Sequence, residues 1–249
     1  MRVLWHELRA QQLLFWRSRE LAFFTFLLPI GFFVLLGSVY GEDEIEGVKG
    51  SRYLLAGLLG YGVAATAFAG LSISLVIRRE EGILKRLRAT PLPPATAIAA
   101  MLGSTLVVYA LEAVALIAIG RAFFDVPVPD RLLSLALVLL LGALAFAALG
   151  LALTAFIRSG EGSSAVVNAI YLPMTFISGS FFSPHSFPRA LELIGEILPL
   201  THFIRVVRYV LLEHGQIWSR PGAVSIVAAW GVGGAIVAVR YFRWEPREG

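Results

Sequence analysis

The sequence has 249 residues, of which 57% are hydrophobic and only 15% charged, with a formal net charge of +4. A water-soluble domain of this length would have too little polar surface to stay dispersed, so the composition indicates an integral membrane protein. It contains no cysteine, which excludes disulfides and thiolate metal sites. The basic residues gather at the ends of apolar runs, where they orient a chain in the membrane, so binding to nucleic acid is not expected.

The first 20 residues alternate bulky apolar and basic side chains. One helical face would carry Trp5, Leu8, Phe15 and Trp16. This pattern predicts an interfacial helix over 1–20, with its tryptophans at headgroup depth. The alternative is that this stretch is simply the polar start of the first span. Its polar lead and the apolar run after it are both too long for a signal peptide, so the first span is expected to be retained.

Several apolar runs of about 20 residues follow, each long enough to cross a bilayer core of roughly 30 Å. A span must satisfy its own backbone hydrogen bonds, and these runs are too long for the alternating strands of a barrel, so helices are predicted. The six predicted spans are 21–40, 53–77, 97–120, 132–157, 164–182 and 221–241. The fold class is therefore an all-α integral membrane protein with six transmembrane helices, and 1–249 is expected to form a single transmembrane domain.

The distribution of Lys and Arg predicts the orientation. If the first residues are cytoplasmic, 13 of the 21 basic residues, among them Arg243 and Arg247, fall on the inner side and 8 on the outer side. The excess favours both termini inside, in a multi-pass protein of the inner (plasma) membrane. Small residues at helix-packing spacing, such as Ala56, Gly60 and Ala64, indicate closely packed spans.

A short, densely charged segment, 78–91, separates the second and third predicted spans. One side of a helix here would carry Ile83, Leu84 and Leu87. Glu81 and Lys85 form an i,i+4 pair in the favourable order, acids precede bases as the helix dipole prefers, and Pro91 stops the helix. The pattern predicts a cytoplasmic amphipathic helix suited to bind a soluble partner. The alternative is a basic loop held at lipid headgroups.

The segment 183–215 is too polar for a span and too apolar for an ordinary loop. Its first part is amphipathic, Pro199 breaks it, and a second helical stretch is predicted from Thr201 to His214. Two short outer helices that dip into the membrane and return would fit, provided that they are buried against protein. A structured loop lying flat on the outer surface is the alternative.

Two of these segments carry motifs that resemble those of the permease subunits of type-two ABC exporters, a family of drug, lipid and polysaccharide exporters. An acidic-x-Gly-x-Leu…Thr-Pro pattern is matched by Glu81, Gly82, Leu84, Leu87, Thr90 and Pro91. The pattern at the end of the fifth span is matched by Gly179, Phe181, Phe182, Pro184 and Pro188. A stretch similar to the family's Asn-Pro-Leu-Thr…Arg follows at Pro199, Leu200, Thr201 and Arg208. The sequence departs from the family at Lys85, where an acid is frequent, and at Leu198, where Asn is usual.

The resemblance implies a permease without its own motor, and the sequence indeed lacks a Gly-x-x-x-x-Gly-Lys-Ser/Thr phosphate loop. Two copies of the chain would work in the lipid bilayer with two ATPase subunits, which would bind ATP and Mg²⁺, while this chain would hold no cofactor and catalyse no covalent step. The segment 78–91 would be the coupling helix. Its candidate contacts to the ATPase are Glu80, Glu81, Gly82, Leu84, Lys85, Arg86, Leu87 and Arg88.

The expected cargo is an amphipathic drug or a lipid-like molecule, exported from the cytoplasm or the inner leaflet. Export of a polysaccharide or glycolipid, and a non-transporting scaffold role, remain open alternatives. Glu112 is an acid well inside the third predicted span and is a candidate for the substrate path, with Tyr109 one turn earlier. A polar contact to a neighbouring helix is the alternative for Glu112. Phe176, Phe181 and Phe182 would form an apolar gate where two permeases meet, or else serve as interfacial anchors.

Overall fold

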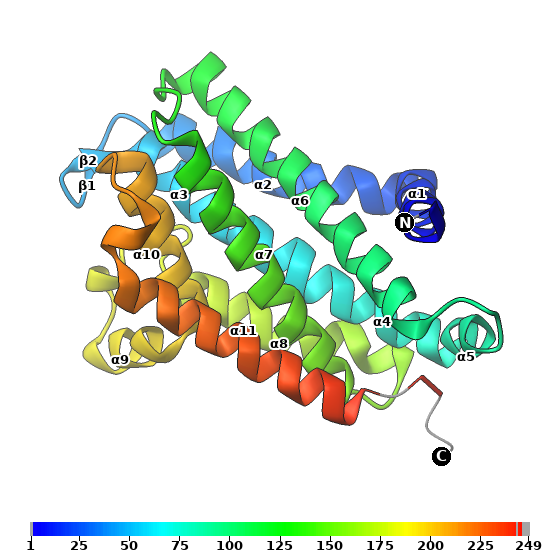
Figure 1. Cartoon of the computed structure of the whole chain (residues 1–249). Helices are drawn as coiled ribbons and strands as arrows, with labels where there is room; N and C mark the ends of the chain where they lie inside the picture. The colour runs from blue at the N-terminus through cyan, green and yellow to red at the C-terminus, as the bar shows by residue number, and fades with distance from the viewer. Residues whose placement is uncertain (1, 243, 246–249) are drawn as a thin grey trace.

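The chain is described by a computed structural model that covers residues 2–242 and 244–245. Two of the basic residues counted for orientation, Arg243 and Arg247, lie outside the described residues. Long helices run side by side between two ends of the molecule, here called the α5 end and the α9 end after the short helices that lie there (Figure 1).

The first half of the chain crosses between these ends three times (Figure 1). Its helices are α1 (Arg2–Arg17), α2 (Arg19–Tyr40), α3 (Gly50–Gly62), the π-helical segment η1 (Val63–Gly70), α4 (Leu71–Glu80), α5 (Ile83–Arg88) and α6 (Pro94–Phe124). Between α2 and α3, strands β1 (Glu44–Ile45) and β2 (Val48–Lys49) pair in an antiparallel hairpin. Its two turn residues, Glu46 and Gly47, both have positive φ, as a tight type I′ turn requires.

The second half adds three more long helices and the short helices of the α9 end (Figure 1). The elements are α7 (Leu132–Thr154), α8 (Gly160–Ile177), the 3₁₀ turn η2 (Pro184–Ser186), α9 (Arg189–Ile197), α10 (Pro199–Leu212), the 3₁₀ turn η3 (Ile217–Ser219) and α11 (Pro221–Tyr241). Pro199 begins α10, because the first helical position needs no backbone N–H. The two short helices expected from the sequence over 183–215 are therefore present.

Among the described residues, five helical segments are long and apolar enough to cross a membrane: α2, α3–η1–α4, α6, α7 and α11. The protein is thus an all-α, multi-pass membrane protein. Helix α8 falls outside this set, because its 18 residues include the polar Glu161 and Asn168. It nevertheless runs between the same two ends as its neighbours (Figure 1).

Segment α3–η1–α4 forms the centre of the bundle. In its most apolar stretch 83% of the residues are buried, against 22% in α2 and in α11. Small residues allow close approach, as the sequence predicts. A Cβ placed on Gly231 of α11 would lie 2.9 Å from the Cα of Ala145 in α7, and one on Gly60 would lie 2.3 Å from Cγ1 of Ile204 in α10.

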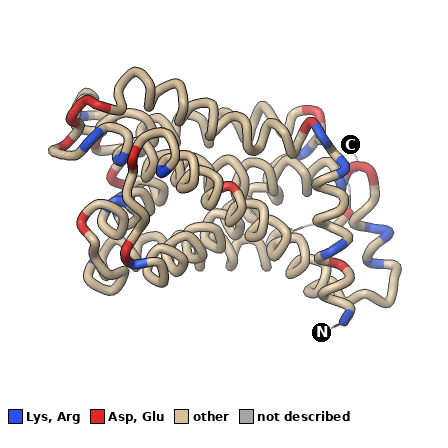
Figure 2. The backbone as a smooth tube through the Cα atoms, turned by 90° about the horizontal axis from the view of Figure 1, so that it is seen from above, with Lys and Arg blue, Asp and Glu red and all other residues tan. Residues whose placement is uncertain are grey.

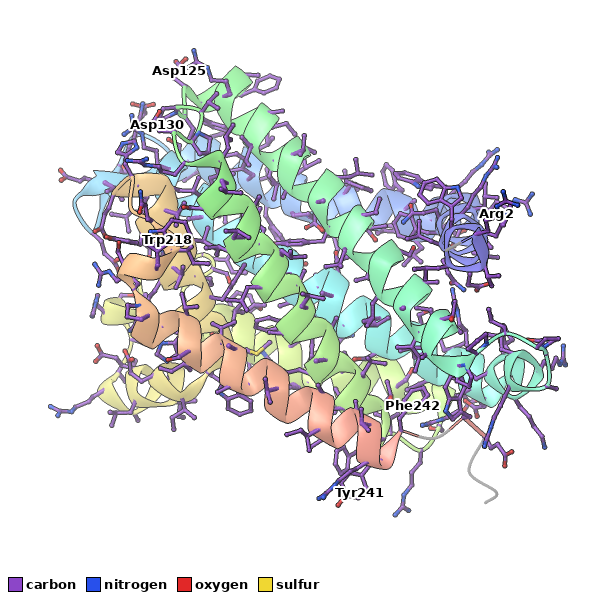
Figure 3. All side chains as sticks on the ribbon, in the orientation of Figure 1. Arg2, Asp125, Asp130, Trp218, Tyr241 and Phe242 are labelled. Atoms are coloured by element: carbon purple, nitrogen blue, oxygen red, sulfur yellow. The ribbon has the colours of Figure 1, made fainter. Side chains whose placement is uncertain are left out.

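Charged residues concentrate at the two ends of the bundle and leave a mostly uncharged middle (Figure 2). Asp125, Asp130 and Trp218 lie at the α9 end, whereas Tyr241 and Phe242 lie at the α5 end (Figure 3). This distribution matches a bundle whose middle lies in hydrocarbon and whose ends lie in water.

The charged segment 78–91 is not the single helix that the sequence predicts. Helix α4 ends at Glu80, and Gly82 adopts the left-handed conformation, with φ of 71°, before α5 begins at Ile83. Glycine tolerates this conformation without the steric cost that a side chain would bring. The acids therefore precede α5 and do not form its first turn, and Glu81 and Lys85 make no ion pair in the part of the chain that the structure describes.

Candidate functional site

Helix α5 places its apolar residues against the bundle and its charges outward. Leu84 is 1% exposed and belongs to the core, and Leu87 packs on that core, whereas Ile83 is exposed. Gly82 is half-buried. The remaining predicted ATPase contacts are exposed: Glu80, Glu81, Lys85, Arg86 and Arg88. A partner at this end would therefore meet a charged surface, while Leu84 holds α5 to its own chain.

The bend from α4 through Gly82 into α5 is called the α4–α5 elbow here. Two residues at the end of α4 join it to the turn between α7 and α8. The buried guanidinium of Arg79 donates hydrogen bonds to the backbone oxygens of Thr154 (2.8 Å) and Ile157 (2.6 Å). The carboxylate of Glu80 accepts a hydrogen bond from the backbone N–H of Gly160 at the start of α8. The cation thus lies at a helix C-terminus and the anion at a helix N-terminus, the favourable arrangement for both dipoles.

The role of Arg79 was not expected from the sequence. A signal was present, because Arg79 falls on the same helical stripe as Ser72, Leu75 and Val76, which are all buried. A basic residue on the buried stripe of a helix must find acceptors inside the protein. In this structure the backbone oxygens of Thr154 and Ile157, at and just after the end of α7, accept its hydrogen bonds.

Glu112 lies buried in α6 and faces the central segment. Its Oε2 accepts a hydrogen bond from Oγ1 of Thr66 in η1, at 2.8 Å, and the residue is 1% exposed. Its Oε1 has no hydrogen-bond partner among the described residues. A Cβ on Gly62 would lie 2.3 Å from Oε1, so the glycine makes room for the carboxyl group. The polar contact to a neighbouring helix, one of the two predicted roles, is therefore present.

Tyr109 strengthens the same contact one turn earlier on α6. Its hydroxyl donates to the backbone oxygen of Leu59 in α3, at 2.8 Å, about one turn before η1 begins. The predicted pair of Tyr109 and Glu112 thus joins α6 to both sides of the point where the central segment changes from α- to π-helix. Such π-helical insertions often mark functional positions.

The three candidate gate aromatics do not share one environment. Phe181 is only 6% exposed, and its ring lies 5.4–5.5 Å from those of Phe32 and Tyr61. Phe176 and Phe182 are 46% and 45% exposed. Phe181 is therefore part of the aromatic core, while Phe176 and Phe182 are free to contact lipid or a second protein.

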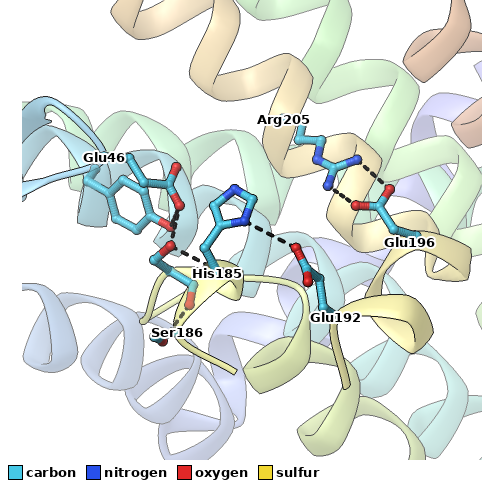
Figure 4. A network of polar contacts seen from close by, with 8 residues as sticks. Glu46, His185, Ser186, Glu192, Glu196 and Arg205 are labelled. Atoms are coloured by element: carbon cyan, nitrogen blue, oxygen red, sulfur yellow. Dashed lines mark hydrogen bonds and ion pairs between the residues drawn. The ribbon is translucent and has the colours of Figure 1, made fainter. Parts of the chain in front are cut away.

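Polar contacts at the α9 end hold its loops together (Figure 4). His185 Nδ1 lies 3.2 Å from Glu192 Oε1, and Arg205 Nη1 donates to Glu196 Oε2 at 2.7 Å. The hydrogen bond from Arg205 lowers the pKa of the Glu196 carboxyl below its ordinary value. Glu46 of the hairpin accepts a hydrogen bond from Ser183, so the hairpin is tied to the turn after α8.

Arg208 connects the same region to the central segment. Its guanidinium lies over the ring of Tyr53, 3.6 Å from the centroid, and donates to the backbone oxygen of Gly179 at 2.6 Å. The cation–π contact and the hydrogen bond together fix the turn after α8 against α3. Nothing in these contacts resembles a catalytic arrangement, and the described residues contain no cluster that could hold a metal ion.

Comparisons with known proteins agree with this arrangement. The family described as "ABC-2 type transporter" matches residues 2–212. A protein named as a transport permease, YvfS of Bacillus subtilis, is 24% identical over 188 residues, which cover 75% of this chain and 76% of the relative. The inner membrane transport permease YadH of Escherichia coli is 23% identical over 183 residues, 73% of this chain and 71% of the relative. Nodulation protein J of Rhizobium meliloti is 37% identical over 75 residues, 30% of this chain and 29% of the relative.

The family match spans far more than half of the chain and includes the α4–α5 elbow, the buried carboxyl of α6 and the short helices of the α9 end. The chain therefore belongs to the ABC-2 type transporter family, as a transmembrane permease subunit.

Proposed function

We propose that this chain is the transmembrane subunit of an ATP-driven exporter, and that α5 with its flanking acids is the coupling element that an ATPase moves. Permeases of this family are not catalytic, and the ATPase is a separate subunit. In the proposed complex that subunit binds ATP and Mg²⁺, and two permeases work with two ATPases.

The observation that carries the proposal is the double attachment of the α4–α5 elbow. Its outer surface is charged and exposed, as a protein-binding surface needs. Its inner side is fixed to the core by Leu84 and to the α7–α8 turn by Arg79 and Glu80. A push on α5 therefore acts on α4 and on the start of α8 together.

Six crossings with the α5 end in the cytoplasm are part of the proposal. Arg2 and Tyr241, the first and last described helical residues, lie at the same end of the bundle, which supports an even number of crossings (Figure 3). Five of the described segments are apolar enough to span, which makes α8 our candidate for the sixth crossing. The excess of Lys and Arg at the α5 end favours its cytoplasmic placement.

The second permease copy would pack against the exposed face of α8 and the nearby aromatics Phe176 and Phe182. This face is apolar and unpartnered within the described chain. The proposed cargo is an amphipathic drug or lipid-like molecule, since the helices offer extensive exposed apolar surface. A glycolipid or polysaccharide cargo is an outcome that transport assays would reveal.

The test is co-purification with a candidate ABC ATPase from the same organism, followed by measurement of ATP hydrolysis. Lys85→Glu/Arg86→Glu reverses two exposed charges of α5 and is expected to abolish association without unfolding the permease. Arg189→Glu, at the exposed start of α9, is the matched control and is expected to associate like wild type. Glu80→Gln changes one candidate contact but leaves the basic side chains of α5 in place, and it weakens the link to α8, so the ATPase would still bind and lose its dependence on the permease.

Three results would contradict the proposal. Equal association of the α5 and α9 variants would remove α5 as the ATPase contact. Normal coupling in Glu80→Gln would remove the link to α8 from the mechanism. Association that never alters ATP hydrolysis would favour a scaffold.

A further inference from the structure

A cavity of about 260 Å³ lies at the α5 end, between α1, the first turns of α2, the central segment and α6. At about 30 Å³ for each water molecule, it is much larger than a site for one or two waters. Its wall combines hydroxyl groups with apolar side chains such as Leu14, Leu21 and Val108. It thus offers both polar and apolar contacts to an amphipathic molecule.

Arg78 gives the cavity its charge. It is half-buried, and its one described hydrogen bond goes to the neutral amide of Gln11, whose Oε1 lies 2.6 Å from Nη1. Glu7 and Glu81 are near, but neither forms an ion pair with Arg78 in the described part of the chain. A guanidinium has five N–H donors, so most of those on Arg78 have no acceptor among the described residues.

Helix α1 forms one wall of the cavity and is joined to α6 by Gln12. Gln11 Nε2 donates to Glu7 Oε1 at 2.8 Å, and Gln12 Nε2 donates to Oγ of Ser104, on α6, at 3.0 Å. The amide of Gln11 therefore stands between the cation of Arg78 and the anion of Glu7. An anion that entered the cavity would replace a neutral acceptor of Arg78 with a charged one, which forms a stronger hydrogen bond.

We infer that this cavity binds an anionic, phosphate-bearing lipid of the inner leaflet, with its headgroup at Arg78 and its chains along α2 and α6. Charge complementarity selects the headgroup: the guanidinium of Arg78, which has no ion pair among the described residues, lines the cavity together with Ser74 and Ser104. The amphipathic α1 and the apolar surface of α2 supply the depth at which such a lipid lies. The leaflet rests on the proposed orientation of the chain, but the binding test below does not depend on transport.

The experiment is binding of phosphatidylglycerol and of phosphatidylcholine with the same chains to the purified full chain in an uncharged detergent, followed by native mass spectrometry. The wild-type chain is expected to prefer phosphatidylglycerol. Arg78→Gln removes the charge and is expected to weaken that binding at least about tenfold, as charge-assisted hydrogen bonds are lost. Arg9→Gln removes an exposed charge of α1 outside the cavity wall and is expected to change nothing.

Ser74→Leu fills the cavity while Arg78 stays charged, and is expected to lower binding of phosphatidylglycerol as well. Arg78→Lys keeps the charge and is expected to keep the preference for phosphatidylglycerol over phosphatidylcholine. This variant provides a second test of the charge if Arg78→Gln does not fold. Equal binding of the two lipids, or equal loss in Arg9→Gln, would overturn the inference. Full competition by inorganic phosphate would also overturn it, since the site would then hold an anion without a lipid.

Discussion

Glu112 is a buried carboxyl whose two oxygens have different surroundings. One oxygen is satisfied by Thr66, and the other faces the space that Gly62 leaves open. An unsatisfied buried oxygen costs free energy and is retained where it serves a purpose. The sequence alone identifies the acid but not its partner, because Thr66 lies on another span.

Replacement of Glu112 separates the hydrogen bond from the charge. Glu112→Ala is expected to destabilise the protein by about 1–3 kcal/mol, because the Thr66 hydroxyl loses its acceptor and a cavity remains. Glu112→Gln retains an oxygen acceptor and is expected to lose much less. Thermal unfolding of the purified variants in detergent measures the difference. Equal losses in the two variants would show that the Thr66 bond does not hold α6 in place.

The pair of Arg205 and Glu196 makes a pH-dependent contribution at the α9 end. Its hydrogen bond lowers the pKa of Glu196, so the folded state binds that proton less readily than the unfolded chain. The stabilisation is complete above the ordinary carboxyl pKa of about 4.5 and is lost as the pH falls through the lowered pKa. Both side chains are more than a third exposed, so the pair is expected to contribute only about 0.5 kcal/mol.

Unfolding of the wild type and of Glu196→Gln at pH 7 and below pH 4 tests this contribution. The two proteins are expected to differ at pH 7 and to converge in acid. A difference that persists unchanged in acid would show that the effect of the substitution is not electrostatic.

At the scale of elements, the bundle helices follow from composition, while their interruptions follow from contacts between distant segments. The predicted span at 53–77 lies within the observed helical run from Gly50 to Glu80, and the last span matches α11. The π-helical segment η1 and the break at Gly82 were not predicted. In both places the backbone departs from regular α-helix where it contacts another helix or bends. The spacing of apolar residues along the sequence does not predict such departures.

The expectations for α5 illustrate the same limit. The sequence assigns Ile83, Leu84 and Leu87 to one apolar side, which a partner or the membrane could cover. The structure shows that the protein itself covers Leu84, and Ile83 stays exposed. Periodicity gives a face to a helix, but it does not say which neighbour packs on that face. The ATPase-facing residues therefore remain a prediction.

The close packing of α3 against the turn after α8 can be tested by adding a single methyl group at Gly57. A Cβ on Gly57 would lie 2.0 Å from the backbone oxygen of Ser180, so Gly57→Ala forces the two segments apart. Overpacking of this kind is expected to cost about 1–3 kcal/mol. Gly31→Ala is the control, since nothing lies within 4 Å of the added carbon and alanine favours the helix. Thermal unfolding should rank wild type above Gly57→Ala, with Gly31→Ala at or above wild type; a reversed order would contradict this packing.

At the scale of the whole molecule, the helical bundle with charged ends can be predicted from the sequence, whereas the packing of α8 into that bundle cannot. Apolar runs and basic ends are sufficient to predict a helical bundle with charged ends, because hydrocarbon excludes both charges and open backbone. The way in which α8 joins the bundle is different. Its polar first half is compensated by the anchor to Glu80 and by burial of Val167 and Tyr171, which only the folded arrangement brings together.

The absence of native cysteine makes the number of crossings directly testable. Single cysteines at three exposed loop positions would report the side of the membrane: Ala89→Cys after α5, Val128→Cys between α6 and α7, and Ser186→Cys between α8 and α9. With six crossings, a membrane-impermeant maleimide added to intact cells is expected to label the cysteines at positions 128 and 186. The cysteine at position 89 should react only after permeabilisation. If α8 does not cross, position 186 will behave like position 89, and the two inner-side positions will then place α9 and α10 on the same side as the coupling element.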